Sequence, residues 1–256
     1  MRYSYKSVQS SAKKIDAWWT TIIVDQIAIP LTYLFANFTN FSANQITIIS
    51  KFLGFSSFYF FYQGTPRDIF IGALLFEISF ILDCVDGKLA RVTKTTSPTG
   101  AYLDYVSDRL VNLTCTLGLM LGVYFQSKNP EILILGSIFL VLITYMRMFN
   151  FHFRIIFKKA NKSFKKSRSK NNFPLFNLVI RIRDYLHDKR IQIMPSTVEV
   201  ETIVFFIAPL LNFVKIGFII GIILSLILLI MQLLIRFKRL SYFKGLKEKF
   251  EENKNI

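Results

Sequence analysis

The chain has 256 residues, of which 52% are hydrophobic and 27 are phenylalanine, a composition that excludes an ordinary soluble domain and a disordered chain. It carries 32 Lys and Arg residues against 16 Asp and Glu, a formal net charge of +16. Such an excess suits nucleic acid, an anionic membrane surface or an anionic substrate, and its placement along the chain decides between them.

The first apolar stretch, 17–38, is interrupted by Trp18, Trp19, Asp25 and Pro30. Paired tryptophans, an acidic residue and a proline favour an amphipathic helix at the membrane interface, and a seventh transmembrane span is the alternative. No apolar core lies close to the first residue, so we expect no cleavable signal peptide. Residues 1–44 are therefore predicted to form a cytoplasmic N-terminus with this interfacial helix.

The rest of the chain predicts an all-α, polytopic membrane protein whose six transmembrane helices form a bundle. The expected spans are 45–62, 69–87, 101–125, 132–157, 202–213 and 216–235. They make up one catalytic domain, 45–236, which includes a basic cytoplasmic segment, 158–196, and is followed by a basic cytoplasmic tail, 237–256. Within the basic segment, the apolar residues of 177–191 lie close to one helical face and predict an amphipathic helix.

Positive charge alternates along the connections between the expected spans. It is concentrated before the first span, between the fourth and fifth, and after the sixth. The link between the first and second spans holds only Arg67, and the link between the third and fourth holds only Lys128. The positive-inside rule then places both termini on the cytoplasmic side, and we expect the cell membrane as the location. Topology and anionic lipid headgroups account for the basic excess, so no nucleic-acid partner is expected.

Two pairs of aspartates are the candidate site. Asp83 and Asp86 are three residues apart, and Asp104 and Asp108 are four apart, so each pair shares one face of a helix. The stretch between them, 90–100, contains Pro98 and Gly100 and predicts a turn that reverses the chain. Two antiparallel helices would bring all four carboxylates to the cytoplasmic end of the bundle.

Four acids in or near lipid repel one another and are costly to desolvate, so they must take up protons or bind cations. Carboxylate oxygens suit Mg²⁺ or Mn²⁺, and two such ions would neutralise a pyrophosphate. Gly87 and Ala90 leave a notch where a ligand can approach the backbone, and Arg91 could meet a phosphate. Solvated residues at a helix end are the alternative interpretation.

The chain resembles the CDP-alcohol phosphatidyltransferase family at all eight fixed positions of that family's signature. The matching pattern is Asp83-x-x-Asp86-Gly87-x-x-Ala90-Arg91, then eight residues, then Gly100-x-x-x-Asp104-x-x-x-Asp108. The resemblance implies transfer of a phosphatidyl or other phosphoryl-linked alcohol group from a CDP-activated donor to an acceptor alcohol, with release of CMP, in phospholipid biosynthesis. It also implies a homodimer.

The resemblance further implies roles for individual residues. The four aspartates would hold two Mg²⁺ or Mn²⁺ ions, and Asp108 would also act as general base on the acceptor hydroxyl. The cytidine diphosphate site would be lined by Gly87, Ala90, Arg91 and Gly100. Family members tend to carry Pro-Asn-x-x-Thr at the entry to the first span; here Ala43 replaces the Pro. Asn44 and Thr47 remain candidates for nucleotide binding, and a helix cap is the alternative role for Asn44.

The acceptor site has weaker signals. A stripe of basic residues on the fourth span could bind an anionic acceptor such as a polyol phosphate, or could snorkel to the interface: Arg147, Arg154 and Lys158. Three glutamates are further candidates, with polar helix packing as the alternative: Glu77, Glu199 and Glu201. We expect direct displacement, since neither the histidines, His152 and His187, nor the cysteines, Cys84 and Cys115, stand out as nucleophiles. The cysteines are expected to be free and buried.

Other functions fit parts of the pattern. The same chemistry could use a soluble CDP-polyol donor with a lipid or polyol-phosphate acceptor. A divalent-cation transporter would use the acids as a permeation site, although acids for that purpose usually lie near mid-bilayer on several spans. A scaffold that binds acidic lipid would leave the four acids unexplained. The clustering of the acids next to Arg91 favours the enzyme.

Overall fold

The computed structural model describes residues 2–161 and 184–252, and over these residues the protein is helical without a strand. An isolated bridge pairs Asp16 with Ile191. Two π-helical segments occur, η1 (Thr20–Val24) and η2 (Ile203–Ile207). The α-helices are α1 (Tyr5–Ser10), α2 (Asp25–Phe38), α3 (Ala43–Gln63), α4 (Pro66–Val92), α5 (Pro98–Ser127), α6 (Glu131–Asn161), α8 (Thr197–Thr202), α9 (Ala208–Leu210) and α10 (Val214–Glu252).

Local sequence sets the ends of the helices that carry the site. Helix α3 begins with a capping box, in which the Ser42 side chain accepts from the Gln45 amide and the Gln45 side chain accepts from the Ser42 amide. The alternative cap role for Asn44 is therefore wrong. Helix α3 ends at Gly64, whose φ of 72° lies in the left-handed region that glycine tolerates. Thr65 then caps α4, with Pro66 in its first turn.

Helix α3 lies against both α4 and α5, and small polar residues fix the α3–α4 contact. The Ser50 hydroxyl donates to the Ser79 carbonyl at 2.9 Å, and the Ser79 hydroxyl donates back to the Ser50 carbonyl at 2.8 Å. About two turns further along α3, the Ser57 hydroxyl donates to the Gly72 carbonyl at 2.7 Å. Small residues that hydrogen-bond between helices are typical of close packing inside membranes.

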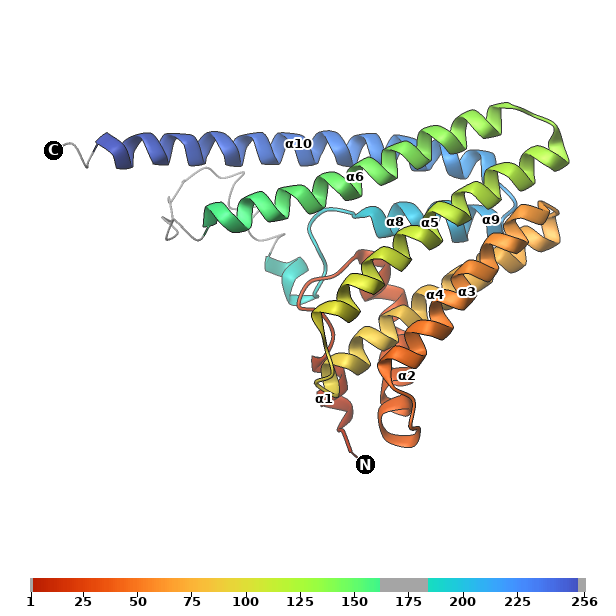
Figure 1. The fold of residues 1–256 in the computed structure, drawn as a ribbon, viewed down its shortest axis with the longest axis horizontal. Helices are drawn as coiled ribbons and strands as arrows, with labels where there is room; N and C mark the ends of the chain where they lie inside the picture. The colour runs from red at the N-terminus through yellow and green to blue at the C-terminus, as the bar shows by residue number, and fades with distance from the viewer. Residues whose placement is uncertain (1, 162–183, 253–256) are drawn as a thin grey trace.

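Close packing also joins α3 to α5. A Cβ atom added at Gly122 would lie 2.0 Å from the Phe61 carbonyl oxygen, so only glycine permits this approach. At this end of the molecule α3, α4, α5, α6 and α10 come together, and toward the other end α6 and α10 diverge from α3 and α4 (Figure 1).

Two clusters of buried side chains hold the helices. The larger one joins α3–α6, α8, η2 and α10 and contains Phe61, Phe76, Leu119, Phe139, Phe205 and Phe218. The smaller one packs η1 and α2 against α3 and α4 and contains Val24, Ala28, Ala36, Ile46, Val85 and Leu89. The N-terminal helices therefore cover the part of α4 that carries Asp83 and Asp86. Both cysteines are free, as predicted; Cys115 is buried, whereas Cys84 is only half-buried, contrary to the prediction.

Within the described parts of the chain, four helices are long and apolar enough to cross a membrane: Thr20–Phe38, Pro98–Ser127, Glu131–Phe149 and Val214–Phe237. The last three correspond to the third, fourth and sixth expected spans. Helices α3 and α4 cover the first and second, and the fifth is built from α8, η2 and α9. The total of six spans stays a prediction. Helix α10 continues unbroken through residue 237 to Glu252, so the expected tail begins within a helix.

The polar residues of the N-terminal stretch face other helices. Asp25 is 3% exposed and pairs with Lys88 of α4 at 2.7 Å. The Trp19 indole N–H donates to Glu77 of α4 at 2.8 Å. Pro30 lies inside α2 without ending it. These contacts explain the polar residues without a membrane surface, so the interfacial position of this segment stays a prediction.

The predicted amphipathic helix 177–191 falls partly outside the described residues. Residues 184–188 are helical, whereas 177–183 are not among the residues described.

Candidate active site

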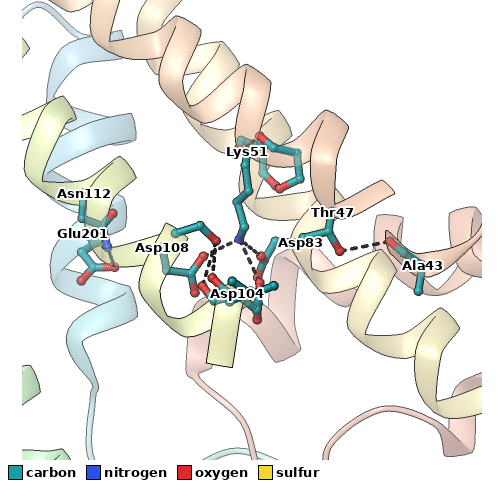
Figure 2. Close-up of polar contacts among 12 residues, drawn as sticks. Ala43, Thr47, Lys51, Asp83, Asp104, Asp108, Asn112 and Glu201 are labelled. Atoms are coloured by element: carbon teal, nitrogen blue, oxygen red, sulfur yellow. Dashed lines mark hydrogen bonds and ion pairs between the residues drawn. The ribbon is translucent and has the colours of Figure 1, made fainter. Parts of the chain in front are cut away.

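Three carboxylates from two helices meet at one point, and we call Asp83, Asp104 and Asp108 the acid cluster (Figure 2). Asp83 comes from α4, and the other two come from successive turns of α5. One oxygen from each carboxylate lies within 4.8 Å of the others. The structure therefore brings together three of the four predicted metal ligands, as the antiparallel arrangement of the two helices required.

Lys51 of α3 lies at the centre of the acid cluster, and the sequence analysis missed it. Its ammonium nitrogen is 3.1 Å from an Asp104 oxygen and 2.5 Å from an Asp108 oxygen, and it also contacts Asp83 (Figure 2). A signal was present, because Lys51 is the single charged residue of α3. An ionisable residue within an expected span is by itself a reason to suspect a functional site.

Asp86, the fourth predicted ligand, lies beside the acid cluster. Asp86 is 5% exposed, and Thr47 of α3 lies beside it; the Thr47 hydroxyl itself donates to the Ala43 carbonyl at 3.0 Å (Figure 2). The Asp86 Oδ2 atom has no hydrogen-bond partner among the described residues. A buried, unpartnered carboxylate oxygen next to three clustered carboxylates is a donor set that suits a hard divalent cation. The residues present therefore fit the metal site that the sequence predicts.

The other signature residues lie at the end of α4 and the start of α5. A Cβ atom added at Gly87 would lie 3.4 Å from a terminal nitrogen of Arg91, so the guanidinium lies over this glycine. Arg91 Nε donates to the Ser11 carbonyl, which ties the N-terminal segment to the motif. The sequence placed Gly100 in the turn between the two helices, but the structure does not. Gly100 lies in the first turn of α5, where its amide donates to the Ser97 hydroxyl at 3.0 Å.

A second ion-pair group lies on the side of α4 away from Asp83 and Asp86. Lys88 pairs with Asp25 at 2.7 Å, and their side chains are 4% and 3% exposed. Arg190 also pairs with Asp25, at 2.9 Å. The Asp16 amide donates to the Arg190 carbonyl, and the Gln192 amide donates to the Asp16 carbonyl. This network, which we call the Asp25 group (Asp25, Lys88 and Arg190), holds the N-terminal segment against α4.

The predicted acceptor residues are only partly described. Arg147 pairs with Glu201, and the Asn112 side chain donates to Glu201 at 3.2 Å, one turn of α5 beyond Asp108 (Figure 2 shows the Asn112–Glu201 contact). Arg147 is thus paired within the protein. The side chains of Arg154 and Lys158 lie outside the described residues.

The structure also shows where the remaining candidate residues lie. Glu199 accepts from the Ser196 amide and from the Trp18 amide, and so acts in helix capping and packing. Asn44 is exposed in the first turn of α3, and Thr47 is half-buried one turn later. Arg109, which follows Asp108, was not predicted; its guanidinium lies over the Tyr105 ring at 4.6 Å.

The sequence profile of the family described as CDP-alcohol phosphatidyltransferase matches residues 40–237. This match covers most of the chain, and the protein belongs to that family.

Curated relatives match shorter stretches. An archaetidylinositol phosphate synthase of Pyrococcus horikoshii is 30% identical over 37% of this chain and 48% of its own length. A CDP-diacylglycerol–glycerol-3-phosphate 3-phosphatidyltransferase of Rickettsia bellii is 35% identical over 32% of this chain and 44% of its own length. In both, the match spans less than half of the relative.

Among solved structures, a phosphatidylinositol phosphate synthase of Mycobacterium tuberculosis with CDP-DAG bound is similar over 78% of this chain and 90% of its own. The sequence identity is 18% and the TM-score is 0.44.

Proposed function

We propose that this protein transfers a phosphatidyl or other phosphoryl-linked alcohol group from a CDP-activated donor to an acceptor alcohol, with release of CMP, in phospholipid synthesis. The observation that carries the proposal is the acid cluster, in which α4 and α5 bring three carboxylates of the family signature within 4.8 Å. Membership of the family supports the reaction class.

The acid cluster and Asp86 would together hold two divalent ions, either Mg²⁺ or Mn²⁺. Bound divalent ions supply charge neutralisation at the pyrophosphate of the donor and at the leaving phosphate. Arg91 lies over Gly87 at the end of α4, where it can pair with a phosphate of the nucleotide. With Gly87, Ala90 and Gly100 it would line the cytidine diphosphate site, and Thr47 and Asn44 would border it.

Asp108 would act as the general base. An alcohol has a pKa far above neutral, so its attack on phosphorus is helped by a carboxylate that takes the proton. The acceptor oxygen would form a bond to the β-phosphorus of the donor as the bond from that phosphorus to the CMP oxygen breaks. The proton of the acceptor would pass to Asp108, and CMP would leave with both electrons of the broken bond.

Arg147, Arg154 and Lys158 would serve the acceptor. In the structure Arg147 is paired with Glu201, and Asn112 links Glu201 to the helix of Asp108. Arg147 and Glu201 therefore lie near Asp108, the proposed base, where they could orient a hydroxylated acceptor. An anionic acceptor would compete with Glu201 for Arg147.

We propose six membrane spans with both termini and the acid cluster on the cytoplasmic side of the cell membrane. Helix α3 has 21 residues, which corresponds to about 31 Å, close to the thickness of a bilayer core. Helix α4, with 27 residues, is longer than a span needs, so its C-terminal turns with Arg91 would extend beyond the lipid. A homodimer is proposed from the family alone.

The test is CMP release by the purified protein in detergent with Mg²⁺ or Mn²⁺. CDP-diacylglycerol and a CDP-polyol are supplied in separate reactions, each with a panel of alcohols and alcohol phosphates. Release that needs both the metal and one acceptor supports the proposal, and the reactive donor decides between lipid and soluble substrates. If no donor gives CMP and the protein carries Mn²⁺ into proteoliposomes, the enzyme hypothesis is wrong and a transporter is the better interpretation.

A further inference from the structure

Lys51 and a divalent cation would use the same carboxylates. The ammonium of Lys51 contacts an oxygen of each member of the acid cluster, and its side chain is 12% exposed. The three residues it contacts are the same three whose oxygens are close enough to hold one metal ion. An ammonium and a metal ion cannot share this position, because two cations a few ångströms apart repel strongly in a partly buried site.

We propose that Lys51 is an internal competitor for the metal ion, and this inference rests on the proposed metal site. Without metal, the ammonium neutralises part of the charge of three converging carboxylates and holds α3, α4 and α5 together. When a divalent ion binds, the ammonium moves aside. Lys51 therefore weakens metal binding while it stabilises the metal-free protein.

The local structure allows this exchange. Lysine carries its charge on a flexible four-carbon stem, so the ammonium can leave the acid cluster without a shift of the backbone. The backbone beside it is fixed, because the neighbouring residue, Ser50, makes two reciprocal hydrogen bonds with Ser79 of α4. The exchange therefore needs only the Lys51 side chain to move.

The experiment measures Mn²⁺ binding directly, by calorimetry on the purified full-length protein in detergent without donor or acceptor. Lys51→Met removes the ammonium, and Lys51→Gln removes the charge but keeps a hydrogen-bond donor. Lys51→Arg keeps the charge, and Lys94→Met removes an exposed lysine from the turn between α4 and α5 as the matched control.

Both neutral variants are expected to bind Mn²⁺ about tenfold or more tightly than the wild type, since a competing charge a few ångströms away is gone. Lys51→Arg and Lys94→Met are expected to stay at the wild-type affinity. In EDTA the neutral variants should unfold at a lower temperature than the wild type, and Mn²⁺ should raise their midpoints by more.

Equal or weaker Mn²⁺ affinity in folded Lys51→Met and Lys51→Gln would overturn the proposal and leave the metal site intact. Failure of both neutral variants to fold even in excess Mn²⁺ would overturn it too, because a bound ion should replace the ammonium. Absence of Mn²⁺ binding in the wild type and in every variant would remove the metal site and the proposed function together.

Discussion

Two lysines on neighbouring helices, buried Lys88 and half-buried Lys51, differ in the charge around them. Lys88 of α4 meets a single acid, Asp25, which also pairs with Arg190. Lys51 of α3 meets three acids. The Asp25 group has more positive than negative charge and is complete within the protein. The acid cluster keeps an excess of negative charge that protons or further cations must balance. The Asp25 group stabilises the fold, whereas the acid cluster can bind further cations for catalysis.

The largest expected effect is on the acid cluster. Asp108→Asn keeps the size of the side chain and removes the base, so CMP release should fall about a hundredfold or more. The midpoint of thermal unfolding in EDTA should not fall, because the substitution relieves repulsion among the acids. A variant that retains most of the activity would remove Asp108 from the proposed mechanism.

The Asp25 group should respond in stability. Asp25→Asn leaves Lys88 buried without its acid, which typically costs about 3–5 kcal/mol. The loss should be the same in EDTA and in Mn²⁺. Labelling of buried Cys115 by a thiol-reactive dye on heating reports unfolding. The control, Glu131→Gln, breaks an exposed pair with Lys215 and should leave the midpoint nearly unchanged. An equally small effect for Asp25→Asn would show that the two regions do not differ.

The effect of Mn²⁺ on the free energy of unfolding should also distinguish the acid cluster from the Asp25 group. Excess Mn²⁺ at a hundred times its dissociation constant should stabilise the wild type by about 2.7 kcal/mol. Asp25→Asn should show the same increase, whereas Asp104→Asn, which removes one member of the acid cluster, should show much less. Unfolding curves with and without EDTA measure this. An undiminished increase in Asp104→Asn would place the metal elsewhere.

The smallest expected effect is at the entry to α3. Asn44 is exposed, and Thr47 lies beside buried Asp86. Asn44→Ala should raise the KM for the donor by about twofold, because Asn44 is exposed and would touch the nucleotide only at the border of its site. Thr47→Val should raise it more. The reverse order would mean that the bound nucleotide reaches further toward the start of α3 than we propose.

Much of the site was predictable because the aspartates obey helical spacing. Residues three and four apart share a face, so the spacing and the reversal of the chain predicted that the two pairs converge, and three of the four aspartates do. Lys51 could not be assigned this way. The position of Lys51 depends on the packing of α3 against both α4 and α5. That packing is set by Ser50, Ser57 and Gly122, and their sequence pattern does not indicate which residues they contact.

The N-terminal stretch shows the same limit. Asp25 and Trp19 favour a membrane interface in the sequence, because polar groups in an apolar run usually seek water. They instead contact Lys88 and Glu77 of α4. A polar residue in an apolar run indicates that a partner is needed, but the sequence does not say whether that partner is water or another helix.

The central claim is that the acid cluster carries out group transfer, and a single reaction tests it most directly. CMP and the new phospholipid are measured together as the purified protein consumes CDP-diacylglycerol and an acceptor in Mn²⁺. We expect the two products in equal amounts, with neither formed in EDTA nor by Asp108→Asn. CMP without a matching lipid, or equal product formation by wild type and Asp108→Asn, would contradict the account.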